Sequence, residues 1–216
     1  MFNSLAHNTS NALLNYCLHV FRCAPPLYNI NKYVFCPTNV VQRFKYMTAL
    51  SEVITNTGEN IQTISENKTV MLVFLRHFGC QFCRQAIDEI SKMRAQLLKG
   101  GTEFIFVHMA THELAEAYFQ KFNLSGVQHV SDPECSLYVD FGLVKGSTTQ
   151  LFGLQSWYRG FTLIAKYGSE IGSQLGDNFQ MPGVFVIQNG IIKNSFIHRI
   201  VSDRPDYFKL IECCAV

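Results

Sequence analysis

The sequence has little charge and no apolar run long enough to cross a membrane. Asp, Glu, Lys and Arg make up only 16% of its 216 residues, and the net charge is +2. No cluster of Lys and Arg stands out, so we expect no nucleic-acid partner. The apolar stretch 13–21 is too short to span a bilayer, and Asn15 and His19 interrupt it. No cation precedes this stretch, as one would in a secretory signal, and we therefore expect neither membrane attachment nor secretion.

The first 46 residues lack Asp and Glu altogether. The first acidic residue is Glu52, although the mean acid content would place about three acids in such a stretch. An organelle presequence is acid-poor in this way, which would make the protein mitochondrial. A loosely ordered extension, or sequence upstream of a true start at Met47, is the alternative, and we favour it because cations are few. We predict an extension at 1–46 and one domain at 47–216.

Eight cysteines are present, and only two of them form a C-x-x-C motif. The eight are Cys17, Cys23, Cys36, Cys80, Cys83, Cys135, Cys213 and Cys214. An even number is compatible with the disulfide framework of a small secreted protein. Because the chain is long and 48% apolar, it can form a core of its own and does not need such cross-links. We therefore predict a cytoplasmic protein in which most thiols are free.

From residue 47 onward, apolar runs of strand length alternate with amphipathic segments. The predicted strands are 68–75, 102–108, 127–130, 183–188 and 191–197. The predicted helices are 80–98, 111–122, 132–142 (with Asp132 as N-cap and Pro133 as first residue), 151–167 and 206–213. Asn189-Gly190 predicts a hairpin between the last two strands, whereas the earlier strands must pair in parallel through their helices. The fold class is therefore α/β, with a mixed central sheet flanked by helices on both faces.

Cys80 and Cys83 open a predicted helix directly after a buried strand. Redox chemistry needs a thiolate, and a helix N-terminus stabilises one through its free N–H groups and its dipole. Arg76 and His77 place further positive charge nearby. Residues three apart in one helical turn can close a disulfide with little movement. We predict that Cys80, at the exposed first position, attacks the substrate and that Cys83, on the apolar face, resolves the product.

A zinc half-site is the main alternative for this motif. Structural zinc needs four ligands, which two C-x-x-C pairs commonly supply, and no second pair occurs here. Cys135, His77 or His108 would have to converge on the motif. The other alternative is a pair of ordinary buried thiols. We favour redox chemistry without a metal or a cofactor.

Several segments together carry a family resemblance over about residues 47–216. They are Phe74-Leu75-Arg76-His77-Phe78-Gly79-Cys80-Gln81-Phe82-Cys83, Asp132-Pro133 with Leu137-Tyr138 and Phe141-Gly142-Leu143, 181–187 (MPGVFVI), and Asp203-Arg204-Pro205-Asp206. In this order the chain resembles thioredoxin-fold proteins of the AhpC/TSA peroxiredoxin-like family, and within it the SelL-like redoxins. The resemblance implies that Pro182 is a cis-proline beside the redox pair and presents the Met181 backbone to a substrate sulfur.

One departure from the family pattern concerns the residues before Cys80. Peroxiredoxins carry a Pro and a Ser or Thr there to bind peroxide, and this chain has Arg76, His77, Phe78 and Gly79 instead. Arg76 is either a stabiliser of a thiolate or peroxide oxygen, or a solvated side chain at a strand end. We expect an antioxidant thiol-disulfide oxidoreductase that reduces a peroxide or a disulfide, with thioredoxin or glutathione as reductant. A redox-inactive or metal-binding module and a thiol-based sensor are the alternatives.

The other candidate residues have simpler interpretations. Cys135 is either a second resolving thiol or a buried or capping residue, and we favour the latter. Cys213 and Cys214 are expected to be free thiols. Trp157 and Tyr158 are expected to pack in the core, with a substrate groove as the alternative.

Overall fold

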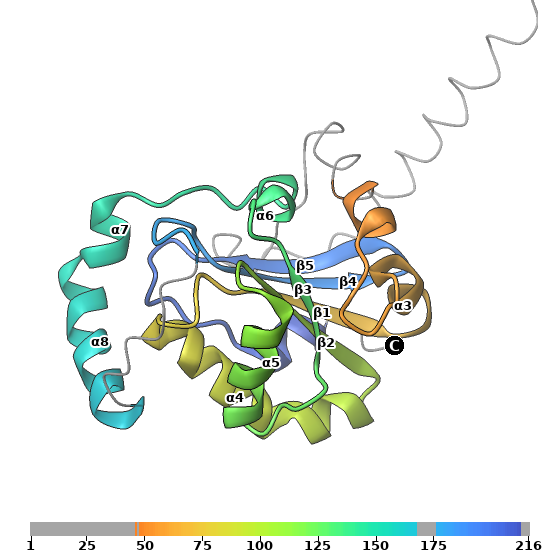
Figure 1. The fold of residues 1–216 in the computed structure, drawn as a ribbon, viewed down its shortest axis with the longest axis horizontal. Helices are drawn as coiled ribbons and strands as arrows, with labels where there is room; N and C mark the ends of the chain where they lie inside the picture. The colour runs from red at the N-terminus through yellow and green to blue at the C-terminus, as the bar shows by residue number, and fades with distance from the viewer. Residues whose placement is uncertain (1–45, 47, 168–175, 213–216) are drawn as a thin grey trace, which may run out of the picture. The chain divides into compact units, whose positions relative to one another are not determined.

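A computed structural model describes residues 46, 48–167 and 176–212. These residues form a five-stranded sheet with the order β3-β2-β1-β4-β5 (Figure 1). The strands are β1 (Thr69–Phe74), β2 (Thr102–His108), β3 (Gln128–Ser131), β4 (Gly183–Gln188) and β5 (Ile191–Ile197). Strand β1 pairs in parallel with β2, and β2 with β3, whereas β4 is antiparallel to both β1 and β5. The predicted mixed sheet is confirmed.

Helices cover both faces of this sheet. They are α3 (Ile61–Asn67), α4 (Gln81–Lys99), α5 (His112–Lys121), α6 (Ser136–Asp140), α7 (Thr148–Phe152), α8 (Leu154–Tyr167) and α9 (Tyr207–Ile211). Alternate residues of β1 point to opposite faces, so Met71 and Val73 pack with α4 and α5, and Leu72 and Phe74 pack with α3 and α6. Figure 1 shows α4 and α5 on one side of the sheet and α6 on the other.

Local sequence signals predicted several element ends correctly. Thr111 caps α5, and its hydroxyl accepts a hydrogen bond from the Leu114 N–H. Asn189 and Gly190 both have positive φ, 53° and 67°, and join β4 to β5 as the predicted hairpin. Helix α9 begins after its N-cap Asp206, whose side chain accepts a hydrogen bond from the Lys209 N–H, and it runs to Ile211.

Other predicted boundaries were wrong. Helix α6 begins at Ser136 and not at Pro133, because Cys135 takes a left-handed conformation (φ 58°) between them. The Asp132 carboxylate still accepts hydrogen bonds from the N–H groups of Ser136 and Leu137. The predicted helix 151–167 is divided into α7 and α8 around Gly153. Helix α3, capped by Asn60, was not predicted.

The predicted extension lies outside the described residues apart from Tyr46, whose ring packs against Phe141. Among the helices of the described ranges, none combines the length and apolar character that a membrane span requires.

Candidate functional site

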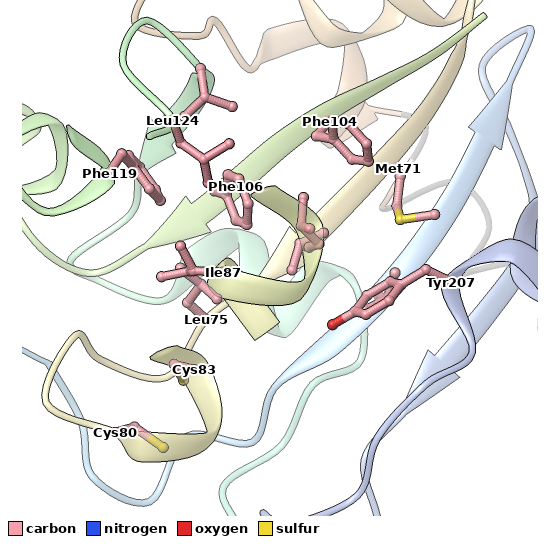
Figure 2. Close-up of a cluster of buried hydrophobic side chains, with 14 of the residues drawn as sticks. Met71, Leu75, Cys80, Cys83, Ile87, Phe104, Phe106, Phe119, Leu124 and Tyr207 are labelled. Carbon is pink, nitrogen blue, oxygen red and sulfur yellow. The ribbon is translucent and has the colours of Figure 1, made fainter. Parts of the chain in front are cut away.

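The cysteine pair lies after β1, at the N-terminus of α4. Cys80 is the N-cap residue of α4, and Cys83 lies in its first turn. The Cys80 N–H donates to the carbonyl of His77 at 3.0 Å, which closes the turn between strand and helix. Figure 2 shows both cysteines on this turn, at the edge of the cluster that contains Leu75 and Ile87. The apolar face of α4 therefore fixes the position of the pair.

Both thiols are free and buried. Cys80 is 6% exposed and Cys83 is 3% exposed, so the expectation that Cys80 is exposed was wrong. Both residues belong to the cluster of buried apolar side chains around α4, and α8 packs against α4 nearby. A groove of about 340 Å³ remains between them, lined by Cys80 and Phe82 on one side and by Phe161 and Ile164 of α8 on the other.

Arg76 contacts both sulfurs. One guanidinium nitrogen lies 3.5 Å from the Cys80 sulfur, and the Arg76 backbone N–H donates to the Cys83 sulfur at 3.3 Å. The other terminal nitrogen donates to the carbonyl of Asn178. Arg76 is only 7% exposed, so it is not the solvated side chain of the alternative interpretation. Its charge is held beside Cys80 by a backbone group about a hundred residues away in sequence.

The two thiols differ in acidity. A hydrogen bond from the Cys83 thiol lowers the pKa of Cys80 well below its usual value, and the charge of Arg76 lowers it further against the opposing effect of burial. Donating that hydrogen bond, together with burial, raises the pKa of Cys83. The arrangement favours a thiolate on Cys80 and a protonated thiol on Cys83, which is the division of roles that an attacking and a resolving cysteine require.

Pro182 lies beside the pair, but its peptide bond is trans, as are all those of the described residues. The implied cis-proline is therefore wrong. The backbone of Met181 is already hydrogen-bonded, since its N–H donates to the Val144 carbonyl and its carbonyl accepts from the Gln180 amide. Pro182 instead leads directly into β4, a position that trans-proline tolerates well.

A small cavity lies behind the pair. It measures about 30 Å³ and is lined by Cys80, Cys83, Pro182 and His198, among others. That volume holds about two water molecules. The imidazole Nδ1 of His198 donates to the Pro182 carbonyl at 3.1 Å, and burial lowers the pKa of His198 to about 4. Sequence reasoning did not single out His198 or Asn178, because only the fold brings them to the motif.

The other predicted ligands do not converge on the motif. His108 pairs with His129, with 2.8 Å between Nε2 and Nδ1. Cys135 lies 3.2 Å from the Met109 sulfur, and burial raises its pKa. Within the described part of the chain, no group of three or more His, Cys, Asp or Glu side chains is arranged to hold a metal ion. Tyr158 is 74% exposed and so does not pack in the core.

Two predicted features cannot be compared with the structure. Cys213 and Cys214 lie outside the described residues, and so does the side chain of Trp157.

Comparison with known proteins connects this fold to a family. The AhpC/TSA antioxidant enzyme family matches residues 89–202, which begin just after the cysteine pair. The prostamide/prostaglandin F synthase of Salmo salar is 27% identical over 168 residues, covering 76% of this chain and 81% of that protein. The enzyme of the same name from Aquarana catesbeiana is 27% identical over 156 residues, covering 70% and 76%.

Among solved structures, peroxidoxin BcpB of Mycobacterium tuberculosis superposes with a TM-score of 0.51 at 11% identity, covering 76% of this chain and 91% of that one. The mixed sheet with helices on both faces is thus the thioredoxin-like fold that the sequence predicted. With more than half of its residues matched by the family model, the chain belongs to the AhpC/TSA antioxidant enzyme family.

Proposed function

We propose that the protein is a thiol-dependent oxidoreductase that cycles between a Cys80/Cys83 dithiol and a disulfide. The observation that carries this proposal is the contrast between the two buried thiols, one acidified by its neighbours and the other kept protonated. Both contact Arg76, and Cys80 opens onto a groove. A pair of thiols with only a structural role would not need this difference in acidity.

The proposed cycle has two chemical steps. The Cys80 thiolate attacks a peroxide oxygen or a disulfide sulfur, so that an S–O or S–S bond forms and the O–O or S–S bond of the substrate breaks. The Cys83 thiol then attacks the Cys80 sulfur, which releases water or the second thiol and leaves the Cys80–Cys83 disulfide. Two equivalents of a thiol reductant, thioredoxin or glutathione by class, restore the dithiol.

Mass spectrometry tests the cycle directly. The tryptic peptide 77–84 contains both cysteines and no other. Mild treatment with hydrogen peroxide should lower its mass by two hydrogens, and a thiol reductant should restore it. Cys80→Ser should abolish both this change and turnover, whereas the control Cys135→Ser should leave both intact. An unchanged signal in Cys80→Ser would refute the proposal.

The names of the relatives favour a second candidate function, which would use the same two thiols. They are named prostamide/prostaglandin F synthase, which suggests a lipid substrate of the prostaglandin class. The apolar side chains of Phe82, Phe161 and Ile164 beside Cys80 suit such a substrate. Steady-state rates with hydrogen peroxide, a long-chain hydroperoxide, an aromatic disulfide and a prostaglandin-class lipid would rank the substrate classes.

The same assays separate the remaining alternatives. A thiol-based sensor would become oxidised once, without turnover when thioredoxin or glutathione is supplied. A metal-binding module would carry stoichiometric zinc that resists a chelator and would form no disulfide. We expect repeated turnover and a reducible disulfide.

A further inference from the structure

The groove that leads to Cys80 contains a histidine without a role in the cycle described above. His77 is 9% exposed, and its Nδ1 atom is buried without a hydrogen-bond partner among the described residues. A buried polar atom with no hydrogen-bond partner lowers the stability of the fold. Its presence therefore calls for an explanation, and a functional role is one. His77 and Cys80 begin and end one backbone turn, in which the Cys80 N–H donates to the His77 carbonyl at 3.0 Å. Both residues line the groove.

The surroundings of His77 keep its imidazole neutral. Burial lowers its pKa, and the Arg76 charge lowers it further, while a thiolate on Cys80 would raise it. Among the described residues that line the groove, the titratable ones are Arg76, His77 and Cys80. Of these side chains, the imidazole of His77 is the one that can both accept and donate a proton near Cys80.

We propose that His77 delivers the proton that the leaving group of the substrate needs when the Cys80 thiolate attacks. This inference rests on the oxidoreductase function proposed above. The imidazole first takes up a proton from solvent that enters the groove, and the Cys80 thiolate then attacks the substrate. The O–O or S–S bond of the substrate breaks, its electron pair leaves on the departing oxygen or sulfur, and the imidazolium protonates that atom. The products are a sulfenic acid and an alcohol, or a mixed disulfide and a thiol, and His77 returns to its neutral form.

The contribution of His77 should depend on the leaving group. An alkyl hydroperoxide expels a strongly basic alkoxide, which leaves readily only when it is protonated, and a positioned acid–base group contributes about 10²–10⁴-fold to such a step. An aromatic disulfide expels a weakly basic thiolate, which needs no proton.

The test compares two substrates in the full-length protein. For His77→Gln we expect the rate of Cys80 oxidation by tert-butyl hydroperoxide to fall about 100-fold, and the rate with 5,5′-dithiobis(2-nitrobenzoate) to fall less than about threefold. The matched control is His112→Gln, at an exposed position on α5, and it should keep both rates. An equal loss with both substrates would indicate a structural role for His77 and overturn the inference, as would no loss with either.

A second variant tests proton transfer independently of any packing defect. In His77→Ala, added imidazole should restore part of the hydroperoxide rate and leave the aromatic disulfide rate unchanged. No rescue, in a variant that still reacts normally with the aromatic disulfide, would count against proton transfer. If the wild-type protein itself turns over neither substrate, the oxidoreductase proposal fails and this inference fails with it. If the wild type turns over and His77→Gln matches it, this inference alone fails.

Discussion

One guanidinium nitrogen of Arg76 lies 3.5 Å from the sulfur of Cys80. Both side chains are buried, so solvent screens this contact less than it would at the surface. The guanidinium of Arg76 also donates a hydrogen bond to the Asn178 carbonyl, and this bond fixes the guanidinium in place. A fixed cation beside a buried thiol stabilises the thiolate without recruiting water.

Removing the Arg76 charge should make Cys80 a weaker acid. In Arg76→Gln we expect the pKa of Cys80 to rise, and its alkylation by iodoacetamide at slightly acidic pH to slow roughly tenfold, because a charge-assisted hydrogen bond contributes about 1.5–3 kcal/mol. The pH dependence of thiolate absorbance in the ultraviolet measures the shift. The control Lys99→Gln, at an exposed position at the end of α4, should behave as wild type. Unchanged alkylation in Arg76→Gln would contradict this role.

Replacing the resolving thiol should trap the first product. In Cys83→Ser a disulfide substrate should remain attached to Cys80, because no second sulfur is available to displace it. The tryptic peptide 77–84 should then carry the mass of the substrate thiol, and the wild-type peptide should not. The double variant Cys80→Ser/Cys83→Ser provides the control and should carry no adduct. An adduct that forms on Cys135 instead would move the attacking role away from Cys80.

The buried His108 should make the fold sensitive to acid. Burial and the neighbouring His129 and His112 lower the pKa of His108 from 6.5 to about 3. As the pH falls, the unfolded chain therefore binds a proton at this residue before the folded protein does. The folded protein has its full stability above pH 6.5, and it loses stability as the pH falls toward 3. Each such proton changes the free energy of unfolding by up to about 1.4 kcal/mol per pH unit.

Urea unfolding at a series of pH values measures this dependence. His108→Gln should have a shallower slope below pH 6.5 than the wild type, because one buried histidine has been removed. Lys99→Gln, at an exposed position at the end of α4, should keep the wild-type slope. Equal slopes for wild type and His108→Gln would show that this histidine does not control acid unfolding.

A buried tyrosine of α6 is hydrogen-bonded to β2 and to the residue that follows β1. The Tyr138 hydroxyl donates to the carbonyls of Leu75 and Val107, the latter at 3.2 Å, at the ends of β1 and β2. In Tyr138→Phe these acceptors lose their buried donor, and we expect the free energy of unfolding to fall by about 1–2 kcal/mol. Tyr158→Phe, at an exposed position, should change stability by less than about 0.5 kcal/mol. Equal stability of Tyr138→Phe and wild type would contradict this prediction.

Short-range sequence signals predicted most of the fold. Asn189-Gly190 specifies its hairpin because both residues accept positive φ, and Thr111 specifies the start of α5 through one hydrogen bond to its own helix. The placement of Cys80 and Cys83 on the first turn of α4 is equally local. Helix α3 was not predicted, because it is only seven residues long and is stabilised by packing against the sheet.

The sequence by itself determined the order of the strands and helices and put two thiols at a helix N-terminus, since those features depend on residues within a few positions of one another. Only the tertiary structure decided the environment of the thiols. It placed Cys80 in a groove beside α8, fixed Arg76 through the Asn178 carbonyl and left the peptide bond of Pro182 trans. The physical reason is distance along the chain: burial and charge at Cys80 depend on segments 80 to 100 residues away, for which no local pattern exists.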